Sequence, residues 1–286
     1  MAASSTTGIS TSAPAAEHVL ERAGCRLRYW LAGPEDRPLV VLSHGMALDH
    51  RMFDAQARAL AGDYRVLAWD LRGHGRSQPA GAPLTVAALV DDLLAILYQV
   101  GRQRAAIVGH SLGGIVAQEL AFRFPARVSA LATFGCSCIT LPAPAPLALA
   151  NRYASIPLRV LRHVPHWPLL RLSVALMAER PETRAQAAEM ASRITPAVFL
   201  QTLAALATSM HPEPNYRFEQ PLLIAYGEGD RYGRPQRAAR AWAARDTQAQ
   251  VVAIPGAGHN ANQDNPAAFN DALLEFLGQA LGDRTS

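Results

Sequence analysis

The segment AAIVGHSLGGIVAQEL, residues 105–120, places a serine between glycines at the point where an apolar run meets a helical pattern. The apolar run predicts a buried strand, and the residues after Ser111 predict a helix. A sharp turn between the two exposes the serine oxygen and requires the small neighbours Gly109 and Gly113. The helix N-terminus behind the serine supplies free N–H groups where an oxyanion would form. We therefore predict that Ser111 is a nucleophile rather than a helix N-cap.

A serine hydroxyl is a poor nucleophile without a base and a group that orients the base. His259 follows the last apolar run, in the loop IPGAGHNANQDNP, and is the predicted base. The segment LLIAYGEGDRYG offers two acids, Glu228 and Asp230, and the spacing after the strand favours Asp230. The apolar run before it, ALATFG, is followed by no carboxylate, which also favours Asp230. His110 adjoins the serine, and we expect it to have a packing role.

An acyl-transfer site also needs two backbone donors for the oxyanion. The residue after the nucleophile, Leu112, supplies one N–H. The loop that follows the apolar run LVVLS begins with His44 and Gly45, and the N–H of Met46 is the predicted second donor.

These side chains must stand at the ends of strands in one sheet. Apolar runs within residues 25–33, 38–45, 64–70, 104–110, 128–137, 221–230 and 250–259 predict strands, most of them continuously apolar and separated by helical patterns. Such runs are typical of strands buried on both faces of a parallel sheet. Residues 139–220 instead predict several amphipathic helices broken by prolines, which indicates a helical insertion.

The predicted organisation follows from these patterns. Residues 1–16 are rich in Ser, Thr and Ala and predict a flexible tail. Residues 17–138 form the first part of an α/β core, residues 139–220 the insertion, and residues 221–286 the second part of the core.

Composition excludes several function classes. The formal net charge is +4, but the basic residues are scattered, so no nucleic-acid-binding patch is expected. The chain contains no lysine, which excludes a Schiff-base or phosphate-loop lysine. Three cysteines, two of them one residue apart, do not make a disulfide framework. With no signal peptide and no apolar run of membrane-spanning length, we expect a soluble cytoplasmic protein.

The motifs together resemble the α/β-hydrolase superfamily over the chain from about Cys25 to its end. The resemblance rests on His44-Gly45-Met46, on DLRGHGRS (residues 70–77), on GHSLGG, and on Asp230 and His259 in that chain order. It implies an α/β fold, a mostly parallel sheet with helices on both faces, and an inserted helical cap that shapes the substrate pocket. Within DLRGHGRS, a frequent turn in the family, Asp70 and His74 are expected to be structural.

The resemblance implies hydrolysis of a carboxylic ester or lactone with a small to medium, largely apolar substrate and no cofactor. Aspartate-nucleophile relatives such as epoxide hydrolases do not match Ser111, and Asn260 replaces the Trp common after the histidine in carbon–carbon bond hydrolases. Thioesterase, carbon–carbon bond hydrolase, cofactor-free perhydrolase and slow-turnover ligand receptor remain alternatives. The oligomeric state is not predicted.

Two features of the insertion could indicate other kinds of site. His163 and His166 could suggest a metal pair, but a proline between them and the lack of a nearby Cys or carboxylate make us expect no metal. Arginines in the insertion could form a solvated face or meet an anionic group or a membrane surface: Arg152, Arg159, Arg162 and Arg171.

Overall fold

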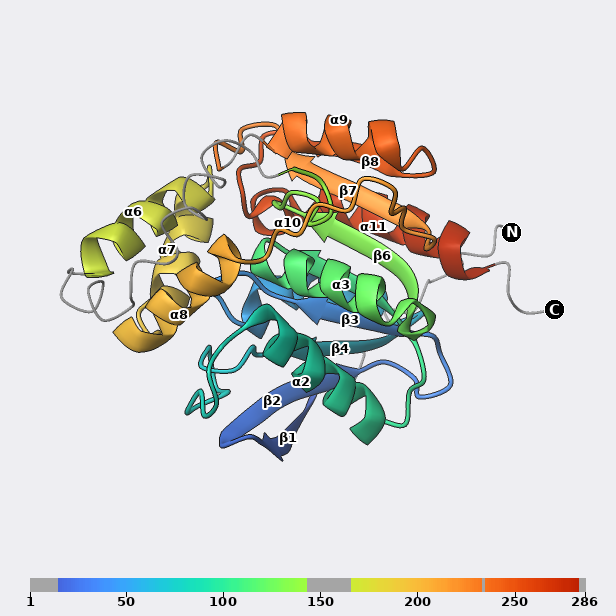
Figure 1. Ribbon diagram of the computed structural model, residues 1–286. Coiled ribbons are helices and arrows are strands. Elements are labelled where there is room, and N and C mark those ends of the chain that lie inside the picture. The colour runs from blue at the N-terminus through green and yellow to red at the C-terminus, as the bar shows by residue number, and fades with distance from the viewer. Residues whose placement is uncertain (1–14, 143–165, 233–234, 283–286) are drawn as a thin grey trace, which may run out of the picture.

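A computed structural model describes residues 15–142, 166–232 and 235–282 of the chain, and these residues build one sheet of eight strands (Figure 1). The strand order is β1-β2-β4-β3-β5-β6-β7-β8. Strands β1 and β2 run antiparallel to their neighbours, and all other pairs are parallel. The strands are β1 (Ala16–Arg22), β2 (Cys25–Ala32), β3 (Leu39–Ser43), β4 (Arg65–Trp69), β5 (Ala105–His110), β6 (Val128–Phe134), β7 (Leu222–Gly227) and β8 (Gln250–Ile254).

Helices cover both faces of this sheet, as the sequence predicts. In Figure 1, α2 and α3 lie together in front of the strands, and α11, which packs against α1, lies behind them. The helices of the core are α1 (Asp54–Leu60), α2 (Val86–Gln99), α3 (Leu112–Arg123), α9 (Pro235–Arg245), α10 (Ala261–Asp264) and α11 (Pro266–Leu281), with short 3-10 turns at His50–Phe53 and Pro125–Arg127.

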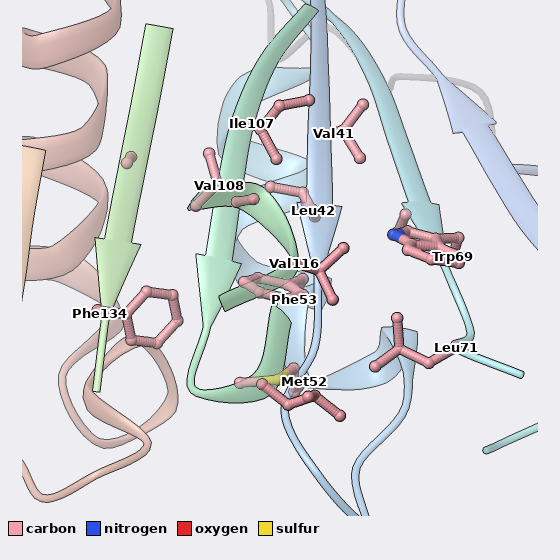
Figure 2. Packing of buried hydrophobic residues seen from close by; sticks show 14 of the residues in the cluster. Val41, Leu42, Met52, Phe53, Trp69, Leu71, Ile107, Val108, Val116 and Phe134 are labelled. Atoms are coloured by element: carbon pink, nitrogen blue, oxygen red, sulfur yellow. The ribbon is translucent and has the colours of Figure 1, made fainter. Parts of the chain in front are cut away.

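The central strands are apolar throughout because both of their faces are covered. Every residue of β3 and of β5 is buried. Figure 2 shows the resulting core, in which side chains of these two strands meet those of the surrounding elements: Val41, Leu42, Met52, Phe53, Trp69, Leu71, Ile107, Val108, Val116 and Phe134. The ring of Phe134 packs edge-on against Phe53, with centroids 6.1 Å apart, and fixes the end of β6 beside β5.

The helical insertion lies between β6 and β7. Its described helices are α6 (His166–Met177), α7 (Pro181–Ala191) and α8 (Pro196–Ala207). They stand together at the end of the sheet toward which the parallel strands point (Figure 1). No single helix of the described residues is long and apolar enough to cross a membrane, and only the pair α7 and α8, bent by 110°, passes that test when taken together.

Strand β1 was not predicted from the sequence. Its residues AEHVLER are mostly polar because β1 is the edge of the sheet, and its residues are exposed or half-buried. It pairs with β2 through a tight turn at Ala23 and Gly24, whose φ angles are 48° and 75°. Ala16, the last residue of the predicted tail, begins this strand, and residues 1–14 lie outside the described residues.

A buried ion pair fastens the turn after β4 to helix α2. The guanidinium of Arg72 binds both carboxylate oxygens of Asp92, with its Nε 2.6 Å from Oδ2. The two side chains are 2% and 0% exposed. Arg72 also donates to the carbonyls of Ala80 and Ala82, so its charge is fully engaged in the turn.

We expect Asp92→Asn to lower the free energy of unfolding by about 3–5 kcal/mol, because it leaves the buried Arg72 guanidinium without a counter-charge. Urea denaturation followed by circular dichroism measures this loss. The same substitution at the neighbouring, half-buried Asp91, which forms no ion pair among the described residues, should change the value by less than about 0.5 kcal/mol. Equal losses in the two variants would contradict the structural role of the pair.

Candidate active site

The turn between β5 and α3 holds Ser111 in a backbone conformation that side chains rarely adopt. Its φ is 49° and its ψ is −112°, in the positive-φ region that favours glycine. The turn is held by hydrogen bonds from Ser111 N–H to the carbonyl of Phe134 (2.9 Å) and from Ile115 N–H to the carbonyl of Ser111 (3.0 Å). Strain of this kind persists only where the surroundings enforce it, and it often marks a functional site.

The glycines around the serine are required by close packing of backbone. A Cβ atom on Gly109 would collide with the carbonyl of Gly113, and one on Gly113 would collide with the carbonyl of Ser43. Helix α3 therefore begins directly against the end of β3. This agrees with the sequence prediction that a side chain at either glycine would collide with nearby backbone.

His259 and Asp230 meet at the neighbouring strand ends. The Nδ1–H of His259 donates to Oδ2 of Asp230 at 2.9 Å, and the two side chains are 3% and 0% exposed. The other oxygen of Asp230, Oδ1, accepts from the N–H of Tyr232 at 2.7 Å, which fixes the carboxylate plane. Glu228, the alternative acid, is exposed. Of the two carboxylates, Asp230 is the one hydrogen-bonded to the histidine.

The turn of Ser111 and the ring of His259 both lie against the segment Phe134-Gly135. A Cβ atom on Gly135 would lie 2.9 Å from Cε1 of His259, and the preceding residue, Phe134, accepts the hydrogen bond from Ser111. The ring of His110 lies 4.8 Å from that of His259, and its Nε2 is 3.1 Å from the carbonyl oxygen of His259. His110 is thus buried and packed against His259, in agreement with the role expected for it.

The loop after β3 contacts the serine turn. A Cβ atom on Gly45 would lie 3.2 Å from Cβ of Ser111, so the loop touches the turn. The carbonyl of Gly45 accepts from Nδ1–H of His44 at 2.7 Å and from Leu48 N–H at 3.3 Å. In a trans peptide the N–H of the next residue, Met46, points the opposite way.

No described residue accepts a hydrogen bond from the N–H of Met46 or from that of Leu112. Both donors therefore remain available to a bound group. Their assignment as an oxyanion hole, and that of Ser111, His259 and Asp230 as catalytic residues, stays a prediction.

Burial disfavours the charged form of three histidines around the site. Burial lowers the pKa of His44 and lowers the pKa of His110 well below its usual range, and it lowers the pKa of His74 to about 3. Because Nε2 of His44 accepts from the N–H of Leu71, its proton sits on Nδ1 and is donated to the Gly45 carbonyl. Neutrality of His44 therefore helps to hold the loop that carries Met46.

This burial predicts a loss of stability on acidification. The folded-state pKa of these histidines lies below the unfolded value of about 6.5, so the unfolded chain binds protons first as the pH falls. The free energy of unfolding should decrease as the pH falls below 6.5, and His74, whose pKa is lowered to about 3, should contribute up to about 1.4 kcal/mol per pH unit of this loss. His74→Asn, which keeps a donor to the Arg72 carbonyl, should flatten the slope by one proton in denaturation curves between pH 4.5 and 6.5. Unchanged slopes would contradict this assignment.

One group of side chains in the described part of the chain has metal-ligand atoms within 4.8 Å of one another: Asp49, His50 and Asp70. Their carboxylates are already occupied. Asp49 binds the guanidinium of Arg51, and Asp70 accepts from His50 and from the N–H of Arg76. The group is a hydrogen-bonded network that shapes the turn at residues 70–77, which agrees with the structural role expected for Asp70.

Several sequence predictions lie outside the described residues. They concern His163, the side chain of His166, and the arginines at positions 152, 159 and 162. Arg171 is described, is exposed, and places its guanidinium carbon 6.0 Å from the ring centroid of Trp167.

Two further side chains, not predicted from the sequence, lie close to the histidine or its loop. The ring of Tyr232 lies 4.9 Å from that of His259, and the carboxylate of Asp264 binds the backbone N–H of Gly258. Tyr232 follows Asp230 closely, so its proximity could have been inferred. For Asp264 the only clue was its place five residues after His259.

Comparison with known proteins matches most of this chain to one protein family. The model of the alpha/beta hydrolase family matches residues 40–272. Over 261 residues, 86% of this chain and 83% of the relative, the chain is 28% identical to sn-1-specific diacylglycerol lipase ABHD11 of Mus musculus. It is 36% identical over 109 residues to 3-oxoadipate enol-lactonase 1 of Acinetobacter baylyi, a match that spans 38% of this chain and only 41% of that enzyme.

Among solved structures, a hydrolase from Pseudomonas aeruginosa PA01 superposes with a TM-score of 0.76. The superposition covers 92% of this chain and 98% of that one, at 28% sequence identity. The sheet order, the serine turn and the matched family model lead to one conclusion: this chain belongs to the alpha/beta hydrolase family.

Proposed function

We propose that this protein is a serine hydrolase that cleaves a carboxylic ester or lactone of a small to medium, largely apolar substrate. The observation that carries the proposal is the buried hydrogen bond from His259 to Asp230, placed at the strand ends beside the positive-φ turn of Ser111. A buried carboxylate on Nδ1 holds the imidazole with its Nε2 lone pair free to take a proton.

The reaction follows from these roles. His259 removes the Ser111 proton through Nε2, and the serine oxygen attacks the carbonyl carbon of the substrate. The N–H groups of Met46 and Leu112 stabilise the negative oxygen of the tetrahedral intermediate. The imidazolium, stabilised by Asp230, returns its proton to the leaving alcohol, and an acyl-enzyme forms. Water then attacks the acyl-enzyme, with the same histidine as base.

Two relatives support the substrate class. One is named a diacylglycerol lipase and the other an enol-lactonase, so their names describe an ester and a cyclic ester. We assign α6, α7 and α8, within the insertion at residues 139–220, to a cap that shapes the pocket, because these helices stand at the end of the sheet that carries the site. The free thiols of Cys25, Cys136 and Cys138 support a reducing compartment, and we propose the cytoplasm.

A series of p-nitrophenyl esters of increasing acyl length, together with small aliphatic lactones, tests the proposal. Turnover of at least one substrate well above that of Ser111→Ala supports it, and the optimal chain length measures the pocket. If thioesters are cleaved and oxygen esters and lactones are not, the substrate class is wrong while the serine mechanism stands. If wild type and variant both show only background hydrolysis, the proposal is wrong, and a ligand receptor becomes the better account.

A further inference from the structure

Asp264 is a buried carboxylate that the proposed reaction does not use. It lies at the end of α10, is 2% exposed, and accepts three backbone N–H groups. Its Oδ2 accepts from Gly258 and from Glu179, both at 2.8 Å, and its Oδ1 accepts from Arg180 at 3.2 Å. Gly258 immediately precedes His259, whereas Glu179 and Arg180 join α6 to α7.

The peptide between His259 and Asn260 is held from two sides as well. The carbonyl of His259 faces Nε2 of His110, at 3.1 Å, on the strand that carries the serine. The N–H of Asn260 donates to the carbonyl of Met177, the last residue of α6, at 2.7 Å. The backbone after the candidate base is therefore hydrogen-bonded directly to the insertion, and the backbone before it is linked to the insertion through Asp264.

Close approach of the two segments depends on Gly258. A Cβ atom there would lie 3.3 Å from Cα of Ala178, which is tighter than most Cβ contacts. The junction of α6 and α7 thus rests directly on the histidine loop. Asp264 holds the junction and the loop together because a carboxylate can accept hydrogen bonds on both oxygens without donating any.

We propose that Asp264 is a positioning residue for His259 and that it couples the helical insertion to the base. This inference rests on the proposed function. Asp264 acts through the N–H of Gly258, which sets the backbone from which the imidazole extends. The same carboxylate also binds Glu179 and Arg180, so the position of α6 and α7 affects the distance between the base and the serine.

Asp264→Asn tests the inference with little change in shape. The amide presents an NH₂ group toward one of the N–H donors, so one side of this junction is repelled. We expect kcat for a short p-nitrophenyl ester to fall about 10- to 100-fold with KM changed less than about threefold, because a small displacement of a catalytic group has costs of this size. Asp271→Asn, the same change at an exposed position on α11, should leave kcat unchanged.

A spectroscopic readout separates positioning from stability. The proton shared between His259 Nδ1 and Asp230 should give a far-downfield resonance, which we expect to shift or broaden in Asp264→Asn and to persist in Asp271→Asn. If Asp264→Asn does not fold, Gly258→Ala decides the question, since its Cβ presses the junction away from the loop while the carboxylate is kept. We expect the same fall in kcat and the same change of the resonance there.

Wild-type kcat together with an unshifted resonance in a folded Asp264→Asn, or in Gly258→Ala where Asp264→Asn does not fold, would overturn the inference. The proposed function is judged separately by Ser111→Ala. If that variant is inactive while the position-264 and position-258 variants match wild type, only the positioning role is wrong. If Ser111→Ala keeps its activity, the proposed function and the inference that rests on it both fail.

Discussion

Ser111→Ala should lower kcat/KM for a p-nitrophenyl ester by a factor on the order of 10⁵ to 10⁶, while the protein keeps its fold. Alanine removes the side-chain oxygen at the φ 49° turn, so the proposed acyl-enzyme cannot form. The remaining acceleration would come from the backbone donors and from binding alone. Alanine is no larger than serine and should fit the same turn, so the thermal unfolding temperature of the variant should stay near that of wild type.

Two measurements check this expectation. Ester hydrolysis gives the rate, and labelling with a fluorophosphonate probe followed by peptide mapping identifies the reactive serine. Ser129→Ala serves as the matched control. Ser129 lies at the start of β6, whereas Phe134, whose carbonyl accepts the hydrogen bond of Ser111, lies at the other end of that strand. Labelling of Ser111→Ala at the wild-type rate would show that another side chain is the nucleophile.

Asp230→Asn should reduce kcat by a factor on the order of 10⁴ and leave KM nearly unchanged. An asparagine can turn its NH₂ group toward His259, and the imidazole then accepts that hydrogen bond on Nδ1. The proton moves to Nε2, the atom that must act as the base, so the wrong tautomer is favoured. Because Asp230 is fully buried, water cannot substitute for the lost carboxylate.

Glu228→Gln is the matched control for this prediction. Glu228 lies two residues away and is exposed, so its substitution should change kcat less than about twofold. The pair of variants also tests the choice between the two acids that the sequence left open. Loss of activity in Glu228→Gln, with full activity in Asp230→Asn, would show that the exposed carboxylate reaches the base during catalysis.

The predictions that the fold confirms rested on patterns of a few adjacent residues. The continuous apolar runs in β3 and β5 predicted strands covered on both faces, and every residue of these strands is buried. The turn at Ser111 was predictable because its geometry depends on a few adjacent residues, the serine and the glycines beside it. The hydrogen bond between Asp230 and His259 could be anticipated because each residue lies in the loop after a strand, and parallel strands end at the same edge of a sheet.

Edge strand β1 escaped prediction for a physical reason. It pairs with β2 on one side only, and its residues are exposed or half-buried, so its side chains carry little of the hydrophobic alternation by which strands are recognised. The buried ion pair of Arg72 and Asp92 could not be predicted from the sequence either. Each residue taken singly is typical of a surface, and only the packing of the turn on α2 removes both from water.

Most elements and the residue types at their ends could therefore be predicted from the sequence, because hydrophobic periodicity and turn chemistry act over a few residues. The contacts that join the insertion to the loop of His259 are visible only in the folded protein. The hydrogen bonds from Glu179 and Arg180 to Asp264 connect residues 85 and 84 positions apart. Such contacts leave no local pattern, since any buried acceptor at that point in space would satisfy the same backbone N–H groups.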